Sequence, residues 1–259
     1  MNEPPFDWAQ SPAAVWRRHR SGLRAIRRLD PISWDDLTGI ARQKQALARN
    51  TERFLAGEPS NNALLWGSRG TGKSSLIKAL LNRYRDQGLR MIEVDKDDLV
   101  NLPEIVDDIC DLPYRFVIFC DDLSFDVGES GYKALKSVLE GSLELPPENV
   151  RVYATSNRRH LMPEFMSDNV KSEVRDGELH PAEAIEEQVS LADRFGLQLS
   201  FYPFSQDIYL QAVDALFPQV ADREQLHIEA VRFATGKGVR NGRTAQQFFR
   251  QFAGDPRFT

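Results

Sequence analysis

Cysteine and histidine are scarce in this sequence, which has two cysteines and four histidines among 259 residues. Cys110 and Cys120 lack the spacing of a metal-binding pair and have no histidine nearby, so we interpret them as core or surface thiols. The histidines are scattered, without an H-x-x-x-H arrangement. These absences argue against a zinc site and favour a reducing compartment.

Long apolar runs are also missing. No uncharged apolar run approaches the ~20 residues that a membrane-spanning helix needs, and residues 1–10 lack the apolar stretch of a secretory signal. The net charge of −5 does not suggest bulk attraction to nucleic acid, although it leaves room for a local basic patch. With 41% hydrophobic and 27% charged residues, the chain is predicted to be a soluble, globular, cytoplasmic protein.

The most informative segment is GSRGTGKS at residues 67–74, which fits the phosphate-loop pattern G-x-x-x-x-G-K-S/T at every fixed position. The glycines let backbone N–H groups curl around phosphate oxygens. Lys73 can reach the β- and γ-phosphates, and the Ser74 hydroxyl can bind Mg²⁺. An apolar run at 62–66 predicts a strand before the loop, and helical spacing over 75–87 predicts a helix after it. This order points the positive end of the helix at phosphate and favours a site for a nucleoside triphosphate with Mg²⁺ over an incidental glycine-rich turn.

Two carboxylates follow another apolar run, FVIFCDD at residues 116–122, which is typical of a buried parallel strand. Ligands lie at the C-terminal ends of such strands. We therefore predict that Asp121 holds Mg²⁺, through water, opposite Ser74, and that Asp122 orients the attacking water. The alternative is an ordinary boundary between a strand and a loop, where acidic residues are common.

Asp122 stands where many ATPases of this kind have glutamate. Aspartate is shorter by one methylene, so the attacking water would be held less well. We predict that ATP hydrolysis is slow, or that Asp126 assists.

A third apolar run, residues 150–157, ends in Asn157. An asparagine at this end of the sheet can hydrogen-bond the γ-phosphate or the attacking water. The alternative is an asparagine that forms a turn after the strand.

The chain divides into a basic leader at 1–33, a region of alternating strands and helices at 34–203, and a helical region at 204–259. The middle region predicts an α/β fold with a parallel five-stranded sheet flanked by helices. Three short helices after it predict a small C-terminal lid. The predicted strands are 63–66, 91–94, 116–120, 150–155 and 197–201.

The leader carries six arginines within twelve residues that contain no acid, at positions 17, 18, 20, 24, 27 and 28. One interpretation is an arm that contacts nucleic acid, a phosphorylated partner or a neighbouring subunit. The other is an amphipathic helix docked on the core, with a solvated arginine face. Segment 161–190 is acidic and polar, so it is interpreted as a surface insertion that docks a partner or as a solvated loop.

Taken together, these motifs resemble the AAA+ ATPases over residues 34–259. The phrases WGSRG at 66–70, CDDLSF at 120–125 and DRFGL at 193–197 are most similar to a bacterial AAA+ family known only as a domain of unknown function. The segments that carry the general resemblance are 35–40, 67–74, 116–122, Asn157, 191–197 and 241–245.

The resemblance implies roles for further residues. Segment 35–40, with Ile40, would line the adenine pocket. Arg194 would reach a neighbouring subunit's site, so the active form would be a homo-oligomer, and Arg243 would act in cis from the lid, with Arg240 one helical turn away as the reserve. A guanidinium suits this work because it can bind the γ-phosphate oxygens bidentately; a surface arginine or an internal salt bridge is the alternative for each.

The predicted site has three parts. The catalytic residues are Asp122, Asn157, Arg194 and Arg243, and the metal-binding residues are Ser74 and Asp121. The nucleotide-binding residues are Ile40, Gly67, Ser68, Arg69, Gly70, Thr71, Gly72, Lys73, Ser74 and Ser75.

The sequence thus predicts an AAA+ ATPase that hydrolyses Mg·ATP at a subunit interface to remodel or switch a macromolecular partner, either protein or nucleic acid. One alternative is a DNA-binding AAA+ protein similar to helicase loaders and initiators, with the arginine leader as its contact. Another is a nucleotide-dependent scaffold that barely hydrolyses ATP. The strand predicted between the phosphate loop and the acidic strand, together with the lid, argues against a small-molecule kinase.

Overall fold

A mixed sheet of seven strands forms the centre of the protein, in the order β2-β1-β4-β5-β6-β3-β7. The computed structural model describes residues 6–17, 22–125, 130–141, 145–159, 161 and 191–258. All five predicted strands are present and pair in parallel. They are β3 (Ala63–Gly67), β4 (Leu89–Glu93), β5 (Arg115–Cys120), β6 (Val150–Ser156) and β7 (Leu197–Phe201).

The sheet has seven strands rather than the five expected, because the leader contributes two. Strand β1 (Ala13–Arg17) pairs in parallel with β4, and β2 (Gly22–Ala25) pairs antiparallel with β1. Ala14 and Trp16 pack on one face of the sheet and Ala13 on the other, which is the period of a strand. The interpretation of the leader as a docked helix is therefore wrong, because its residues 13–17 form a strand that pairs with β4.

Part of the arginine-rich leader lies on this hairpin and the segment after it. Arg17, Arg24, Arg27 and Arg28 are exposed. The arginines at positions 18 and 20 lie outside the described residues, as does nearly all of segment 161–190. The described arginines therefore form a solvated basic edge beside β1 and β2.

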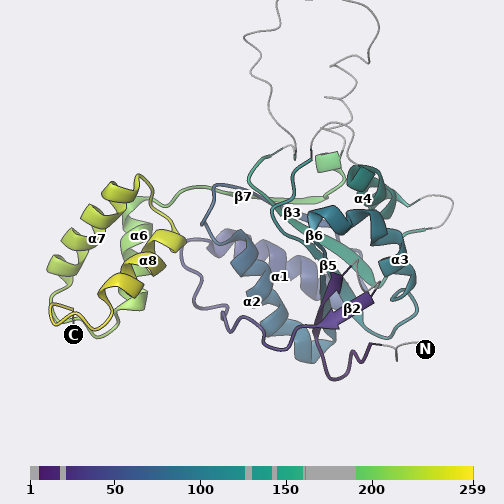
Figure 1. Ribbon diagram of the computed structural model, residues 1–259, viewed down its shortest axis with the longest axis horizontal. Coiled ribbons are helices and arrows are strands. Elements are labelled where there is room, and N and C mark those ends of the chain that lie inside the picture. Colours follow the sequence, from purple (N-terminus) through teal and green to yellow (C-terminus); the bar gives the residue numbers. More distant parts are fainter. Residues whose placement is uncertain are drawn as a thin grey trace, which may run out of the picture.

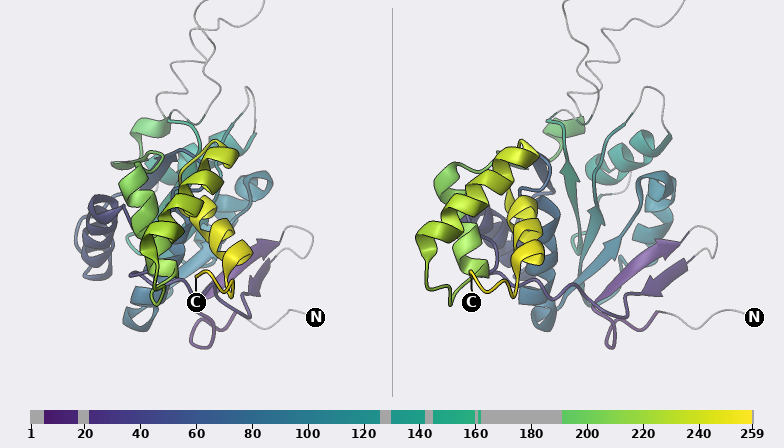
Figure 2. Two further views of the ribbon diagram at one scale, coloured as in Figure 1. Left: turned by 90° about the vertical axis from the view of Figure 1, so that its left-hand side faces the viewer. Right: turned by 60° about the vertical axis from the view of Figure 1, so that its left-hand side comes forward.

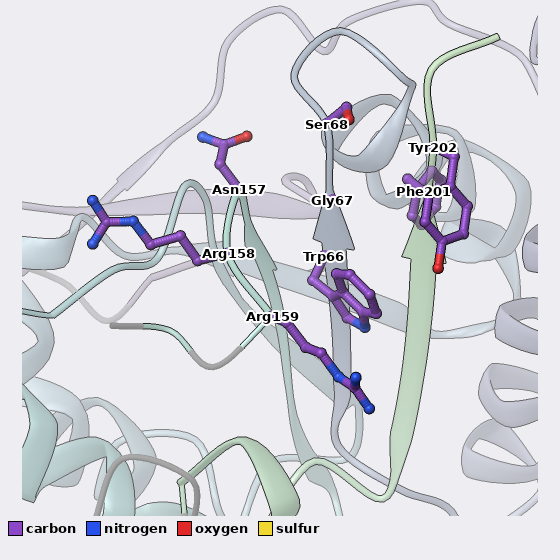
Figure 3. Close-up of a pocket in the computed structure, with 8 residues that line it drawn as sticks. All are labelled: Trp66, Gly67, Ser68, Asn157, Arg158, Arg159, Phe201 and Tyr202. Atoms are coloured by element: carbon purple, nitrogen blue, oxygen red, sulfur yellow. The ribbon is translucent and has the colours of Figure 1, made fainter. Parts of the chain in front are cut away.

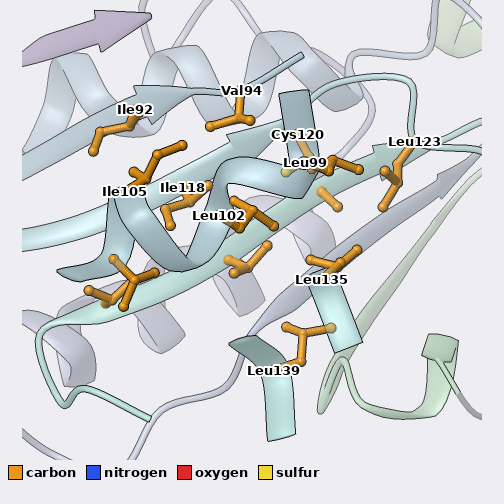
Figure 4. Packing of buried hydrophobic residues seen from close by; sticks show 14 of the residues in the cluster. Ile92, Val94, Leu99, Leu102, Ile105, Ile118, Cys120, Leu123, Leu135 and Leu139 are labelled. Atoms are coloured by element: carbon orange, nitrogen blue, oxygen red, sulfur yellow. The ribbon is translucent and has the colours of Figure 1, made fainter. Parts of the chain in front are cut away.

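Helices cover both faces of the sheet (Figure 1). Helices α1 (Ala41–Leu55) and α2 (Lys73–Tyr84) pack on one face, where their apolar side chains form one cluster with Leu65, Val117 and Phe119. The 3₁₀ helix η3 (Lys96–Asn101) and helices α3 (Leu102–Asp107) and α4 (Ser130–Glu140) cover the other face, over Ile92 and Ile118 (Figure 4). Successive residues of β5 enter opposite clusters, as a strand buried on both faces requires. The short 3₁₀ helix η2 (Arg85–Gln87) links α2 to β4.

The predicted C-terminal helices form a separate small bundle, α6 (Gln206–Leu216), α7 (Arg223–Lys237) and α8 (Gly242–Phe252). Each begins at a side-chain cap: Ser205, Asp222 and Asn241 accept hydrogen bonds from the backbone N–H three residues on. The bundle has its own core, which includes Tyr209 and Phe248. It lies at one end of the molecule and the β1–β2 hairpin at the other (Figures 1 and 2).

Two remaining expectations concern cysteines and membrane helices. Both cysteines are free, and burial raises the pKa of the Cys120 thiol to about 12, so this thiol is an inert part of the core. Among the described residues, no helix is long and apolar enough to span a bilayer.

The hairpin gives a stability prediction. Trp16 is 4% exposed and packs in the main core cluster. We expect Trp16→Ala to lower the free energy of unfolding by about 3 to 5 kcal/mol, because it empties a large buried volume. The neighbouring Arg17→Ala should change it by less than about 0.5 kcal/mol, because Arg17 is exposed. Urea unfolding followed by circular dichroism measures both; equal effects of the two substitutions would contradict the edge-strand assignment.

Candidate functional site

The glycine-rich loop connects β3 to α2 and depends on backbone conformations that glycine permits. The backbone φ angles are +129° at Gly67, +76° at Gly70 and +98° at Gly72, which is the residue before the first turn of α2. A Cβ on Gly67 would lie 2.0 Å from the carbonyl oxygen of Phe201. That same oxygen accepts a 3.0 Å hydrogen bond from the N–H of Ser68. Strand β7 therefore holds the start of the loop, and only glycine fits there.

Lys73 lies buried beneath this loop. Its Nζ donates to the carbonyl oxygens of Gly67 at 2.7 Å and Ser68 at 2.9 Å, and to Oδ1 of Asn157 at 3.2 Å. Burial lowers the pKa of the ammonium group, and the nearby Asp122 carboxylate partly opposes that shift. The cation is thus desolvated but faces neutral oxygens, so an anion in the loop would gain a strong interaction with it.

Ser74 and Asp121 meet at the end of β5. The Ser74 hydroxyl donates to Oδ1 of Asp121 at 2.6 Å, and the Thr155 hydroxyl donates to the same oxygen at 2.5 Å. Thr155 also accepts the N–H of Asp122 at 2.9 Å. The sequence motifs do not single out Thr155, although its place in the polar end of the 150–157 run is a usable signal.

Asn157 joins the other acidic residue to the lysine. Its Nδ2 donates to Oδ1 of Asp122, while its Oδ1 accepts from Lys73. Asp122 has a φ angle of +51°, uncommon for a residue with a Cβ, which turns the chain just after β5. Asp126 lies outside the described residues. The predicted water-orienting acid and the predicted γ-phosphate sensor are therefore in direct contact.

These groups face one cavity of about 1120 Å³ between the sheet and the lid. Gly67 and Ser68 instead line a second cavity of about 490 Å³ on the other side of the loop (Figure 3). The predicted site residues that line the larger cavity are Ile40, Arg69, Gly70, Thr71, Gly72, Lys73, Ser74, Ser75, Asp121, Asp122, Asn157 and Arg243.

The oxygen atoms in this cavity fit Mg²⁺. The hydroxyl of Ser74 and the carboxylate of Asp121 converge there, and hard oxygen ligands are those that Mg²⁺ prefers. The described residues hold no cluster of three metal-binding His, Cys, Asp or Glu side chains. This donor set therefore suits an ion that takes few protein ligands and completes its shell with water and phosphate.

Apolar side chains line the part of the cavity beside α1 and α6. Leu37, Ile40 and Leu216 contribute to this wall. Gly39 has a φ angle of +76°, and a Cβ there would lie 2.3 Å from Cγ2 of Ile208 on α6. The 35–40 segment and the lid are thus in close contact, and together they can enclose a flat apolar group such as a base.

The lid also contacts the phosphate loop itself. Asn241, the cap of α8, donates from Nδ2 to the carbonyl oxygen of Arg69 at 2.9 Å and accepts from the N–H of Thr244 at 2.8 Å. The N–H of Arg243 donates to the carbonyl oxygen of Gly70 at 3.3 Å. The sequence motifs include Asn241 only as part of the lid-helix segment 241–245. Its contact with the Arg69 carbonyl is a tertiary contact, which cannot be predicted from its position as a helix cap.

Two further arginines lie outside the larger cavity. Arg194 precedes β7, at the edge of the sheet opposite the cavity, and its guanidinium pairs with Glu140 at the end of α4. Arg240, the reserve candidate, has its Nε buried without a hydrogen-bond partner among the described residues. Arg194 therefore does not serve the cavity of its own chain.

Comparison with known proteins agrees with this fold. The sequence matches the family described as "Protein of unknown function (DUF815)" over residues 9–256. A search of curated proteins gives no match.

Two solved structures illustrate the similarity. Orc1 from Aeropyrum pernix, solved in complex with DNA, is 16% identical with a TM-score of 0.55, and the match covers 85% of this chain and 60% of Orc1. A RuvB variant from Thermotoga maritima is 13% identical with a TM-score of 0.50, and that match covers 88% of this chain and 74% of RuvB. The chain therefore belongs to the DUF815 family and has the fold of the AAA+ P-loop proteins.

Proposed function

We propose that this protein is an ATPase that binds Mg·ATP in the larger cavity and hydrolyses it at an interface between two copies of the chain. One observation carries the proposal: residues from three separate motifs form one hydrogen-bonded chain at a single cavity. Lys73 bonds to Asn157 and Ser74 bonds to Asp121, and Asp122 and Thr155 connect the two pairs. This chain connects the phosphate loop to the carboxylate of Asp121, proposed to bind the metal, and to the amide of Asn157, proposed to sense the γ-phosphate.

Each residue has a task in this reaction. The loop N–H groups and Lys73 bind the β- and γ-phosphates, and the wall that includes Ile40 holds the base. Ser74 and Asp121 hold Mg²⁺, which neutralises phosphate charge when bound. Asn157 orients the γ-phosphate or the water, and Asp122 accepts the proton of the attacking water. Arg243, on the lid beside the loop, reports whether the γ-phosphate is present.

Hydrolysis is proposed to be slow for two reasons: the Asp122 side chain is shorter than that of glutamate, and its carboxylate already accepts a hydrogen bond. Its carboxylate accepts a hydrogen bond from Asn157, so it must release or share that amide to hold a water. The missing methylene also places the carboxylate farther from the nucleotide than a glutamate would.

A second copy of the chain completes the site. Arg194 lies on the opposite edge of the sheet, paired with the partly exposed Glu140. The Arg194 side chain is 21% exposed and that of Glu140 is 37% exposed, so the pair is partly open to water and a more highly charged anion can compete for the guanidinium. The arginine can therefore exchange Glu140 for the γ-phosphate of a neighbour, where the transition state carries more negative charge. Loss of the γ-phosphate then removes the contacts made by Arg243 of the lid and by Arg194 of the neighbouring copy, so both can move. Through this motion the protein would remodel or switch a macromolecular partner.

A DNA-binding role of the helicase-loader or initiator kind is the second candidate. The observation that favours it is the exposed basic edge formed by Arg17, Arg24, Arg27 and Arg28. The Orc1 structure with a similar fold was solved with DNA. Salt-sensitive DNA binding that is lost in Arg24→Ala/Arg28→Ala would favour this role without disturbing the core.

The first test is nucleotide binding. We expect Lys73→Ala to abolish ATP binding, because it removes the only lysine beneath the loop in the described residues. Titration with a fluorescent ATP analogue measures this. Lys133→Ala, an exposed lysine on α4 outside the cavity, is the control and should bind as the wild type does. Normal ATP binding by Lys73→Ala would remove the basis of the proposal.

The length of the acidic residue gives a second prediction. Asp122→Glu should raise the turnover number several-fold, because the longer side chain reaches the water that Asp122 holds poorly. Phosphate release at saturating ATP gives the rate. Asp122→Asn is the matched control and should lower hydrolysis about 100- to 10,000-fold while leaving ATP binding intact, since general-base catalysis contributes on that order. A large fall in Asp122→Glu would show that the aspartate is the better base here.

The shared site is tested by mixing two inactive variants. Arg194→Ala keeps its phosphate loop and Lys73→Ala keeps its Arg194, so an interface between them can contain both groups. We expect each variant alone to be nearly inactive and an equal mixture to recover about one quarter of the wild-type rate, the fraction of correctly paired interfaces in a randomly mixed cyclic oligomer. Mixing Arg194→Ala with the double variant Arg194→Ala/Lys73→Ala should give no recovery. If Arg194→Ala alone hydrolyses ATP normally, Arg194 has no role in trans.

A further inference from the structure

The smaller cavity lies at the C-terminal ends of β3, β6 and β7, beside the start of the phosphate loop (Figure 3). Its volume of about 490 Å³ is within the range of ligand sites. It shares Asn157 with the larger cavity. Gly67 and Ser68 of the phosphate loop also line it, but nothing in the proposed ATP chemistry uses the side chains of its remaining residues, which are Trp66, Arg158, Arg159, Phe201 and Tyr202.

Two aromatic rings form one wall of this cavity. Tyr202 is 66% exposed, and it is the one aromatic residue among the exposed large hydrophobic side chains of the described chain. Its ring meets the Trp66 ring edge to face, with centroids 6.3 Å apart. Figure 3 shows the two side chains next to each other, at the ends of the neighbouring strands β3 and β7, and both line the cavity. An exposed aromatic face beside a hollow indicates a surface on which another flat ring can stack.

An arginine stands beside these rings. The guanidinium carbon of Arg159 lies 5.5 Å from the centroid of the Trp66 ring, and Figure 3 shows this side chain reaching towards Trp66. Arg158 extends in the other direction from the end of β6. Neither arginine has an ion-pair partner among the described residues, and both are exposed. Arg159 thus offers an unneutralised, bidentate donor next to the aromatic wall.

We propose that this cavity is a second nucleotide-binding site, in which a base stacks on Tyr202 and the attached phosphate pairs with Arg159. Stacking platforms beside arginine are how proteins bind single-stranded nucleic acid and nucleotides without reading sequence. An acidic peptide would satisfy the arginine but would leave the two aromatic faces unused. The ligand is therefore a nucleotide unit, either free or within a single strand.

The position of this site links it to the first one. Phe201 holds Ser68 by a backbone hydrogen bond, and Asn157 contacts Lys73 while lining both cavities. Tyr202 also directly follows β7, where the chain leaves the sheet for the lid. A ligand on Tyr202 thus touches the residues that surround the phosphate loop. Binding at this site does not depend on ATP hydrolysis, so it is tested separately.

The experiment is a fluorescence-anisotropy titration of the full chain with fluorescein-labelled oligothymidylate, without ATP, so that no other nucleotide competes for the smaller cavity. We expect the wild type to bind, and Tyr202→Ala and Arg159→Ala each to bind about tenfold more weakly, as loss of a stacking partner or a charge-assisted contact predicts. Tyr202→Phe keeps the ring and should bind within about twofold of the wild type. Arg158→Ala is the matched control and should also change binding by less than about twofold, because Arg158 points away from the rings. These residues are exposed, and circular dichroism checks that each variant is folded.

Competitors identify the source of the nucleotide. Displacement of the probe by thymidine monophosphate indicates a site for free nucleotide; displacement only by unlabelled strand indicates a site for single-stranded nucleic acid. Either result supports the proposal. It is overturned if the probe does not bind, if polyglutamate displaces it as well as the strand does, or if Tyr202→Ala binds like the wild type. Loss of binding in Arg24→Ala/Arg28→Ala but not in Tyr202→Ala would assign the probe to the β1–β2 edge and would also overturn it.

Discussion

The pairing of β3 with a parallel strand on each side is the constraint on which the rest of the structure depends. Leu65 lies opposite both Thr155 of β6 and Leu199 of β7, and Gly67 lies opposite Phe201. Because all three strands run in the same direction, their C-terminal ends meet at one edge of the sheet. The phosphate loop leaves β3 at this edge, so the neighbouring strands decide what surrounds it. Asn157 arrives from β6, and the Phe201 carbonyl that anchors the loop arrives from β7.

This arrangement also explains which features could be predicted from the sequence. The five parallel strands were recognisable because both of their faces are buried, which makes each one a continuous apolar run. The phosphate loop was recognisable because its glycines and Lys73 each have a local task that no other residue performs. Both signals lie within a few residues of sequence.

The features that were missed depend on contacts between distant segments. The β1–β2 hairpin forms because the edge of β4 accepts a strand more than seventy residues earlier in the chain, and the arginines around Trp16 hide its period of two. Thr155 acts through the register that places it against Asp121, and Asn241 acts through its contact with the Arg69 carbonyl. A hydroxyl or an amide at the end of an element has many local uses, so only the tertiary arrangement shows which one applies.

Asn157 is the point at which these separate constraints meet. Its amide oxygen accepts from Lys73 and its amide nitrogen donates to Asp122, so one planar group links the lysine of the phosphate loop to the acid proposed to orient the attacking water. The same residue lines both cavities. An anion in the loop that draws Lys73 away from Asn157 would disturb Asp122, because the Asn157 amide is bonded to both residues. A ligand that moves the end of β6 would have the same effect. In the proposed reaction, the shorter Asp122 would lose more of its reach than a glutamate for the same displacement, so the rate of hydrolysis would depend on what occupies both cavities.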